Sequence, residues 1–396
     1  METKQARKRR PRPLWSSPIA DIELLASSLS GVMSLGQGIP SFFTPDHIRE
    51  AALRAIKDDL VSRYSMVPGL LGLREEVCRK LATFNSIGAE PNEILITVGA
   101  SEALIVAILA LIEEGDEVLL PTPSYPAHIQ GISLAGGRPV YVPLVEDENW
   151  KLVPEELEKQ VTVKTKAMLL CSPLNPTGTV FAEEDLRRLA EIALKHNLWV
   201  ITDETYEFLT YDGIKHFSIA SIPELRGQVI SCFSLSKTYA MTGWRVGYML
   251  VPIGTIDNMV MVHDAIAICA PVPAQYAALA ALRGPQDCIQ VFRNELAQRR
   301  DIVCERLDKL GIFGYQKPYG AYYVFPRIER MQIDSVEFSV RLLREANVMT
   351  VPGKGFGPTG EGHIRFSFAG PREVIERGFD RLESWLRKTQ KRKVTG

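Results

Sequence analysis

The segment SLSKTYAMTGWRVGY, Ser234–Tyr248, places one lysine among hydroxyl side chains and eight residues ahead of an arginine. A lysine captures a carbonyl carbon only when its surroundings keep its amine partly deprotonated, and Lys237 is the candidate for this nucleophile. Ser234, Ser236 and Arg245 offer two hydroxyls and a planar guanidinium, which suit a phosphate group close to the lysine. The alternative is an exposed lysine at a strand edge, which is the usual meaning of an isolated S-x-S-K.

Two apolar runs upstream end in polar residues that complete such a site. The run AMLL leads into CSPLNPTGTV, residues 171–180, whose Pro/Gly turn presents Asn175. LWVITDETY, residues 198–206, delivers Asp203 and Tyr206. Pyridoxal phosphate chemistry needs a Schiff-base lysine and an acidic partner on the pyridine nitrogen, and Asp203 fits that partner. We then expect Asn175 and Tyr206 to bind the phenolate oxygen of the ring. Taken alone, Asp203 is instead a helix N-cap and Tyr206 a core aromatic.

A further segment, ILITVGASEALIVAILALI, changes from a strand to an apolar helix near Gly99. Backbone N–H groups at a helix start bind anions, so we expect Gly99, Ala100 and Ser101 to form a phosphate cup. The alternative is that Ser101 only caps the helix. The following sequence PTPSYP fixes Tyr125 in a proline-stiffened turn, where its ring can stack on a flat heteroaromatic ring.

In combination these motifs resemble those of the class I and II aminotransferases of fold type I, which use pyridoxal 5′-phosphate. The resemblance extends from about Ser34 to the C-terminus. It rests on G-x-x-x-A after a strand, P-x-Y-P, N-P-T-G, D-E-x-Y, S-x-S-K with arginine at plus eight, and a late I-R-F-S. It implies ping-pong transfer of an amino group from an L-amino acid to a 2-oxo acid, with 2-oxoglutarate as the expected acceptor.

The resemblance implies a role for each site residue. Lys237 would carry the cofactor as a Schiff base and move the proton during transfer, with Asp203 and Tyr206 as the other catalytic groups. Arg365, in HIRFSFAG, matches the arginine that grips the substrate α-carboxylate by a bidentate fork. The implied cofactor set is Gly99, Ala100, Ser101, Tyr125, Asn175, Asp203, Tyr206, Ser234, Ser236, Lys237 and Arg245.

Two N-terminal segments fit the same family. SLGQGIPSF resembles the glycine turn beside the substrate carboxylate, which makes Gly38 a backbone donor and Ile39 a pocket wall, with Asn175 and Tyr125 as further substrate contacts. Its LGQG resembles the glutamine, aromatic and methionine transaminases more than the aspartate specialists. RYSMVPGLLGLRE supplies Tyr64, which would reach the partner subunit's cofactor phosphate. The resemblance therefore implies a homodimer with shared active sites.

The histidines have no assigned part in this chemistry. His128 follows Tyr125 where many relatives have a second aromatic residue, and its role stays open. His363 lies two residues before Arg365, so on a strand it would face the same side, either as a substrate contact or as a structural group. The remaining histidines lack metal-ligand spacing, and we predict no metal site.

Composition fits a soluble enzyme. The 396 residues carry 46 basic and 47 acidic side chains, which gives no overall field for nucleic acid or a membrane surface. The six dispersed cysteines suit a reducing cytoplasm. The longest apolar run, ALIVAILALI, is too short to span a bilayer. We interpret the basic residues 1–14 as a flexible tail, with nucleic-acid contact or organelle targeting as alternatives.

Short β-rich runs alternate with helical patterns through the middle of the chain. This predicts an α/β fold with helices on both faces of a mostly parallel central sheet, with ligands at the ends of the strands. After Cys288 a long charged helix, short strands and a final helix predict a smaller α+β domain. The expected division is a tail at 1–14, an N-terminal segment joining the small domain at 15–44, a large cofactor-binding domain at 45–285 and a small domain at 286–396.

Two other functions share this residue set. A Cβ–S lyase or another pyridoxal phosphate enzyme of the same fold would keep the lysine, aspartate and arginine but release ammonia and pyruvate without a keto-acid acceptor. A DNA-binding regulator built on this domain needs a helix-turn-helix module, for which the residues before Ser34 leave no room. We therefore keep the lyase as the alternative.

Overall fold

The computed structural model describes residues 18–394 apart from 330 and 332, and the expected tail at 1–14 lies outside these residues. A seven-stranded sheet forms the centre of the molecule, in the order β2-β8-β7-β6-β5-β3-β4. Its strands are β2 (Ile94–Thr97), β3 (Glu117–Thr122), β4 (Arg138–Pro143), β5 (Thr165–Cys171), β6 (Trp199–Asp203), β7 (Val229–Ser234) and β8 (Gly247–Leu250).

The sheet is mostly parallel, as the alternation of strands and helices predicts. The strands from β4 to β7 run parallel to their neighbours, whereas β8 is antiparallel to both β7 and β2. Every residue of β2, β3, β7 and β8 is buried, because helices cover both faces and the strands are mostly apolar.

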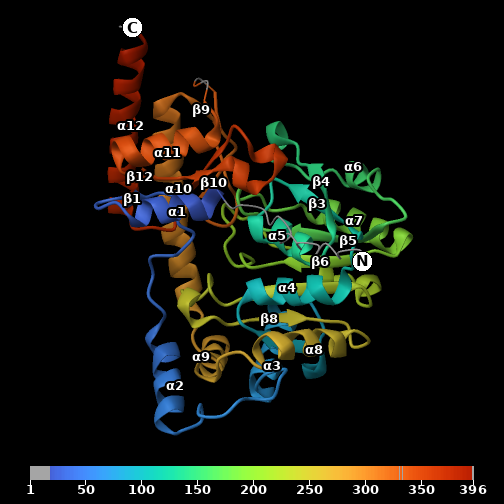
Figure 1. Ribbon diagram of the computed structural model, residues 1–396. Coiled ribbons are helices and arrows are strands. Elements are labelled where there is room, and N and C mark those ends of the chain that lie inside the picture. Colours follow the sequence, from blue (N-terminus) through green and yellow to red (C-terminus); the bar gives the residue numbers. More distant parts are fainter. Residues whose placement is uncertain (1–17, 330, 332, 395–396) are drawn as a thin grey trace, which may run out of the picture.

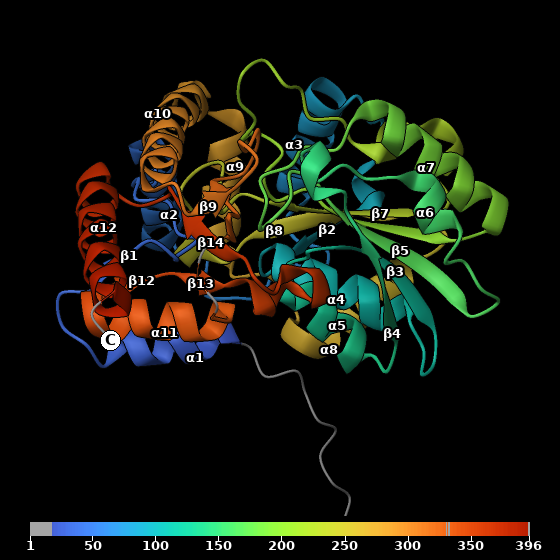
Figure 2. The same ribbon diagram turned by 90° about the horizontal axis from the view of Figure 1, so that it is seen from above.

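Helices pack on both faces of this sheet. In Figure 2, α3, α6 and α7 lie on one face and α4, α5 and α8 on the other. The helices of this part are α2 (Asp46–Lys57), α3 (Leu71–Lys80), α4 (Ala100–Leu111), α5 (Pro126–Leu134), α6 (Pro154–Glu158), α7 (Glu183–His196), α8 (Ile256–Ala267) and α9 (Val272–Arg283). One large apolar cluster fills each side, which is the layered packing expected of an α/β fold.

The C-terminal part builds a second apolar core beside the sheet. Figure 1 shows its helices gathered with α1 next to the sheet. Its helices are α10 (Asp287–Leu310), α11 (Ser335–Ala346) and α12 (Arg372–Val394), and its strands are β9 (Phe313–Gly314), β10 (Tyr323–Val324), β11 (Arg327–Ile328), β12 (Val348–Met349), β13 (Val351–Pro352) and β14 (Ile364–Ser367).

The N-terminal segment lies against this second core. Helix α1 (Pro18–Ser27) packs on α11, and β1 (Met33–Ser34) pairs in parallel with β12. This pairing joins residues more than 300 positions apart in the sequence. The boundaries 15–44, 45–285 and 286–396 remain a prediction.

Short helical turns complete the chain. One π-helical segment, η1 (Leu81–Asn85), directly follows α3. The 3₁₀ turns are η2 (Pro91–Glu93), η3 (Glu146–Glu148), η4 (Ile219–Ser221), η5 (Pro223–Leu225), η6 (Thr242–Trp244), η7 (Gly353–Phe356) and η8 (Pro358–Gly360). Within the described part of the chain, no helix has the length and apolar content that a membrane crossing requires.

Candidate active site

A cavity of about 360 Å³ opens where the sheet strands meet the second core. Strands β5, β6 and β7 end at this cavity. Strand β8 begins at the same place, since Gly247 at its start pairs with Ser234 at the end of β7. The motif residues therefore converge from separate sequence segments at one edge of the sheet. Those that line the cavity are Gly38, Ile39, Ala100, Ser101, Tyr125, Asn175, Asp203, Tyr206, Ser234, Ser236, Lys237, Arg245 and Arg365.

Lys237 is partly buried in this cavity, and its Nζ donates a hydrogen bond of 2.9 Å to the carbonyl of Gly38. Burial, together with the nearby charges of Arg245 and Arg365, lowers the pKa of Lys237 to about 8. An ordinary lysine has a pKa of about 10.4, so its neutral fraction at pH 7 is roughly 0.04%, whereas a pKa of about 8 gives roughly a tenth. The amine is thus prepared to attack a carbonyl carbon.

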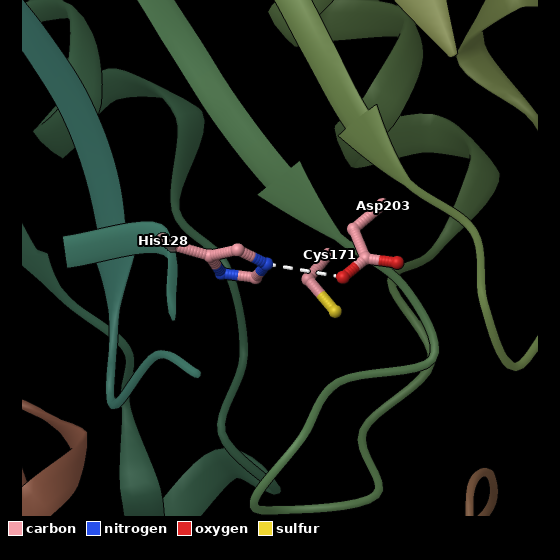
Figure 3. A group of neighbouring side chains, drawn as sticks. All are labelled: His128, Cys171 and Asp203. Atoms are coloured by element: carbon pink, nitrogen blue, oxygen red, sulfur yellow. Dashed lines mark hydrogen bonds and ion pairs between the residues drawn. The ribbon is translucent and has the colours of Figure 1, made fainter. Parts of the chain in front are cut away.

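Asp203 ends β6 and belongs to a buried chain of polar groups. Its Oδ2 lies 3.0 Å from Nε2 of His128 (Figure 3). Nδ1 of His128 lies 3.0 Å from Oγ of Ser124. The N–H of Thr205 donates to Oδ1 of Asp203 over 3.1 Å. Burial alone raises the pKa of Asp203, but the hydrogen bond and charge of His128 outweigh it, and the resulting pKa is below the ordinary value. Asp203 therefore stays an anion.

Cys171 lies beside this pair, and the ligand atoms of His128, Cys171 and Asp203 are within 4.8 Å of one another (Figure 3). A metal requires a thiolate at such a position. Burial, followed by the charge of Asp203, raises the pKa of the Cys171 thiol well above its ordinary value. The imidazole and carboxylate already bind each other, so the chemistry of this group favours a hydrogen-bonded anion over a metal centre.

Arg365 lies on β14 and reaches the cavity from the second core. Its Nη1 donates to Oδ1 of Asn175 over 3.0 Å, and its Nη2 donates to the carbonyl of Gly36 over 2.8 Å. The rings of Tyr323 and Phe356 lie 4.4 and 5.2 Å from the guanidinium carbon. Since its Oδ1 accepts from Arg365, the amide NH₂ of Asn175 is left as a donor. This buried guanidinium offers a planar fork for a carboxylate.

Two tyrosines, Tyr322 and Tyr323, surround Tyr206 in a way that the sequence motifs did not indicate. The hydroxyl of Tyr206 lies 3.0 Å from that of Tyr323, and Tyr322 donates to the carbonyl of Gly38 over 2.8 Å. A Cβ atom on Gly38 would overlap the Tyr323 hydroxyl, so this close approach requires glycine. Burial raises the pKa of Tyr206 well above its ordinary value, which keeps its hydroxyl protonated as a donor.

The expected phosphate cup lies at the start of α4. Gly99 precedes this helix with φ of +78°, a left-handed conformation that glycine adopts without strain. Arg245 lies directly over Gly99, and its Nη2 donates to the carbonyl of Val98 over 3.2 Å. Ser234 accepts a hydrogen bond from the N–H of Ser236, and both serines face the cavity. The helix start and the guanidinium together provide an anion site.

The structure places two other candidates outside this cavity. The side chain of Tyr64 is 75% exposed, on the surface near Val98 and Cys269. His363 precedes β14, stacks on Phe325 at 4.9 Å and lies with Nε2 3.2 Å from Oε1 of Glu146. His363 therefore has structural partners and does not line the cavity with Arg365.

The donor set fits a phosphorylated aromatic aldehyde. A nucleophilic amine, a buried carboxylate, two donors for an anionic oxygen and a phosphate cup all face one cavity. Tyr125, which directly precedes α5, also lines this cavity. Each group has a counterpart in pyridoxal phosphate: the aldehyde, the pyridine nitrogen, the phenolate oxygen and the phosphate.

Comparisons with known proteins agree with this chemistry. The sequence model of the family described as "Aminotransferase class I and II" matches residues 30–382. Among curated proteins, the chain is 40% identical to aromatic-amino-acid aminotransferase 2 of Thermococcus litoralis and 43% identical to an aspartate aminotransferase of Pyrococcus abyssi. Each alignment covers 92% of this chain and 94% of the relative.

Solved structures give the same result. An aromatic aminotransferase from Pyrococcus horikoshii superimposes with a TM-score of 0.88 at 40% identity, over 94% of this chain and 99% of that one. An aspartate aminotransferase from Thermus thermophilus with maleate superimposes with a TM-score of 0.89 at 33% identity, over 94% and 97% of the two chains.

Proposed function

Because this chain belongs to the class I and II aminotransferases, we propose that Lys237, Asp203 and Arg365 carry amino transfer in the cavity between the sheet and the second core. The enzyme is a fold type I aminotransferase that moves an amino group from an amino acid to a 2-oxo acid and depends on pyridoxal 5′-phosphate. The observation that carries the residue assignment is the partly buried Lys237 amine, which shares one cavity with Asp203 and Arg365. The relatives, which are named aminotransferases, do not favour the lyase alternative.

The bound cofactor supplies a ring that accepts electrons. Lys237, as a free amine, would act as the base that moves the proton of the substrate α-carbon. Asp203 would keep the proton on the pyridine nitrogen, while Asn175 and Tyr206 would donate to the phenolate oxygen. Ala100, Ser101, Ser234 and Arg245 would hold the phosphate, Gly99 would allow its close approach, and Ser236 donates its N–H to Ser234 and so would orient it.

Arg365 would fix the α-carboxylate that amino and 2-oxo substrates share, with Gly38 and Ile39 at the pocket wall. A fixed carboxylate orients the α-carbon toward Lys237, which removes much of the entropic barrier to proton transfer. We propose 2-oxoglutarate as the acceptor. One arginine then serves both half-reactions of a ping-pong mechanism.

The Arg365→Lys variant should lower kcat/KM for the amino and 2-oxo substrates together, by about ten- to a thousandfold. Lysine keeps the charge but loses the fork, and a charged bidentate contact contributes about 1.5–4 kcal/mol. Steady-state kinetics of both half-reactions measure this change. Arg300→Lys is the matched control, because Arg300 is buried and pairs with Asp212 away from the cavity.

Impairment of only one substrate would contradict the shared role of Arg365. Release of ammonia by the wild-type protein, without conversion of the cofactor to its amine form, would replace the transferase with the lyase.

We also propose that the enzyme is a cytoplasmic homodimer. The absence of disulfides supports this location, since all six cysteines are free thiols. Large apolar side chains are exposed on α2, on the segment after it and on α8, which favours an interface between copies. They include Leu53, Ile56, Leu60, Met66, Met261 and Ile266. In such a dimer the exposed Tyr64 would bind the cofactor phosphate in the partner subunit.

A heterodimer of a Tyr64→Phe chain and a Lys237→Ala chain should contain one intact site and one doubly damaged site. The intact site combines the unchanged lysine of one chain with the unchanged tyrosine of the other. Differently tagged chains allow this heterodimer to be purified. It should bind cofactor at half of its sites with wild-type affinity and recover about half of the wild-type activity.

The Tyr64→Phe homodimer should bind cofactor about tenfold or more weakly, because a hydrogen bond to a charged group contributes about 1.5–3 kcal/mol. Met66→Leu, a conservative change of an exposed side chain in the same segment, is the control. A heterodimer without any wild-type site, or a fully active monomer on sedimentation, would refute the shared site.

A further inference from the structure

Behind the active site, the turn after β6 sends its side chains to two sides. Asp203, Thr205 and Tyr206 line the cavity. Glu204 and Glu207 point away from it and are buried in the protein, with 3% and 2% exposure. A carboxylate is costly to bury unless it is paired, so each of the two needs partners.

Glu204 is satisfied by uncharged donors and a histidine. The hydroxyls of Thr202 and Ser218 each donate to Oε1 over 2.8 Å, and Nε2 of His216 lies 2.8 Å from Oε2. Glu204, Glu207 and His216 lie close enough together to suggest a metal centre. The positive charge beside these side chains is not a metal ion but the ammonium group of Lys80.

Lys80 forms an ion pair with Oε1 of Glu207. Its Nζ also donates to Oδ1 of Asn85 over 2.8 Å, and the amide of Asn85 donates to Oε2 of Glu207 over 2.8 Å. Lys80 is the last residue of α3 and Asn85 the last of the π-helical segment η1. A π turn closes over five residues, so it brings Asn85 to the face of Lys80, where an α-helix would bring residue 84.

Four aromatic rings enclose the ammonium group. The distances from Nζ of Lys80 to the ring centres are 5.3 Å for Phe84, 5.2 Å for Phe208, 4.6 Å for Phe233 and 5.7 Å for Tyr248. Phe208 directly follows Glu207 and stacks on Phe84 at 3.9 Å. Phe233 directly precedes Ser234, so Lys80 contacts two of the segments that carry the proposed cofactor ligands.

A buried ion pair is an inefficient source of stability, because removing both charges from water costs about as much as their attraction returns. Burial lowers the pKa of Lys80, and the charge of Glu207 acts against this effect. Such a pair instead fixes the positions of the two side chains, because each buried charge is costly without its partner. Here the fixed element is the turn that carries Asp203 and Tyr206.

We propose that Lys80 and Glu207 are positioning residues for amino transfer, which hold the Asp203–Phe208 turn so that the Tyr206 hydroxyl stays directed at the cofactor. This inference rests on the proposed role of Tyr206 in the active site. It assigns a function to the π-helical segment, which places Asn85 against the same carboxylate.

The Lys80→Met variant tests this role with two measurements besides activity. In the protein without cofactor, hydrogen exchange of amides 204–209 should become at least about tenfold faster. In the holoenzyme, the pH at which the visible absorption of the cofactor changes should rise by about one unit, because a donor to the phenolate oxygen favours the deprotonated form. The Tyr206→Phe variant serves as the reference, because it shows how far this pH rises when the hydroxyl donor is removed completely.

Glu207→Gln is the milder second variant, because the ammonium group keeps its aromatic rings. It should change both measurements in the same direction and by less. Glu93→Gln is the control, since Glu93 is buried and paired with Arg226 at the other end of β2 from Gly99. It should leave both measurements at their wild-type values.

Wild-type exchange and wild-type absorption in both variants would overturn the inference, as would equal changes in Glu93→Gln. The failure of the proposed function looks different. In that case the wild-type protein itself shows no pH-dependent absorption from a lysine-bound cofactor, while amide exchange still reports whether Lys80 holds the turn.

Discussion

Replacement of Lys237 by alanine should abolish amino transfer, with kcat falling by about a millionfold, the scale seen when an enzyme loses its nucleophile. The variant loses both the amine that binds the cofactor aldehyde and the base that moves the proton. In the wild-type protein, borohydride should fix the cofactor covalently, and mass spectrometry of peptides should find it on Lys237. A label on another lysine would refute this assignment.

The lowered pKa of Lys237 adds a pH dependence to this prediction. Only the neutral amine attacks an aldehyde, so the rate of cofactor capture by the apoprotein should rise with pH and level off above about 8. An unperturbed lysine would instead level off above about 10.4. Stopped-flow absorption separates the two cases. Lys317→Ala, a change on the surface, should leave the capture rate unchanged.

The central fold and most of the site could be predicted because their signals are local. Each strand is an apolar run, and each ends in a Pro/Gly turn or a helix start that carries a polar residue. Parallel strands end at one edge of a sheet, so Asn175 and Asp203 had to lie close together. The family motifs then indicated which chemistry the shared edge serves.

The antiparallel strand β8 shows where local signals are weaker. It follows β7 after a short connection that leaves little room for a helical crossover, which favours antiparallel pairing. Its other neighbour, β2, is about 150 residues away in sequence, and no local pattern specifies that contact.

His128, Tyr322 and Tyr323 had no predicted role although they surround the site. Ser124 lies just before α5 and His128 in its first turn, and this closeness in sequence is a usable signal for their hydrogen bond. The tyrosines give no such signal, because Tyr323 on β10 and Tyr322 just before it are placed by their contacts with β14 and the residue after it, Phe368. The Lys80 contacts depend likewise on three distant segments, so only the folded chain reveals them.

His363 illustrates the limit of strand alternation. Residues 363 and 365 would share a face if both belonged to one strand. In the structure β14 begins at Ile364, so His363 lies outside the regular strand and turns to Phe325 and Glu146. The boundary of an element, which sequence patterns define least well, decides the side chain's direction.

The Asp203→Asn variant should keep a coloured, folded protein whose turnover is lower by at least about a hundred- to a thousandfold. The amide has the shape of the carboxylate and retains an acceptor for the N–H of Thr205, but it lacks the negative charge. A neutral partner does not hold a proton on the pyridine nitrogen, and the unprotonated ring is a poorer electron acceptor. Loss of one buried electrostatic contact to a transition state costs about 2.7–4 kcal/mol, which corresponds to this range.

Single-turnover absorption measurements test this prediction most directly, because they separate cofactor binding from proton transfer. Cofactor content should be near normal in Asp203→Asn, while conversion to the amine form slows. Cys171→Ala is the matched control: its Sγ lies within 4.8 Å of the Asp203 carboxylate, yet it carries no charge. A control that slows the conversion as much as Asp203→Asn would point to disturbed packing, and near-normal turnover in Asp203→Asn would remove the charge of Asp203 from the mechanism.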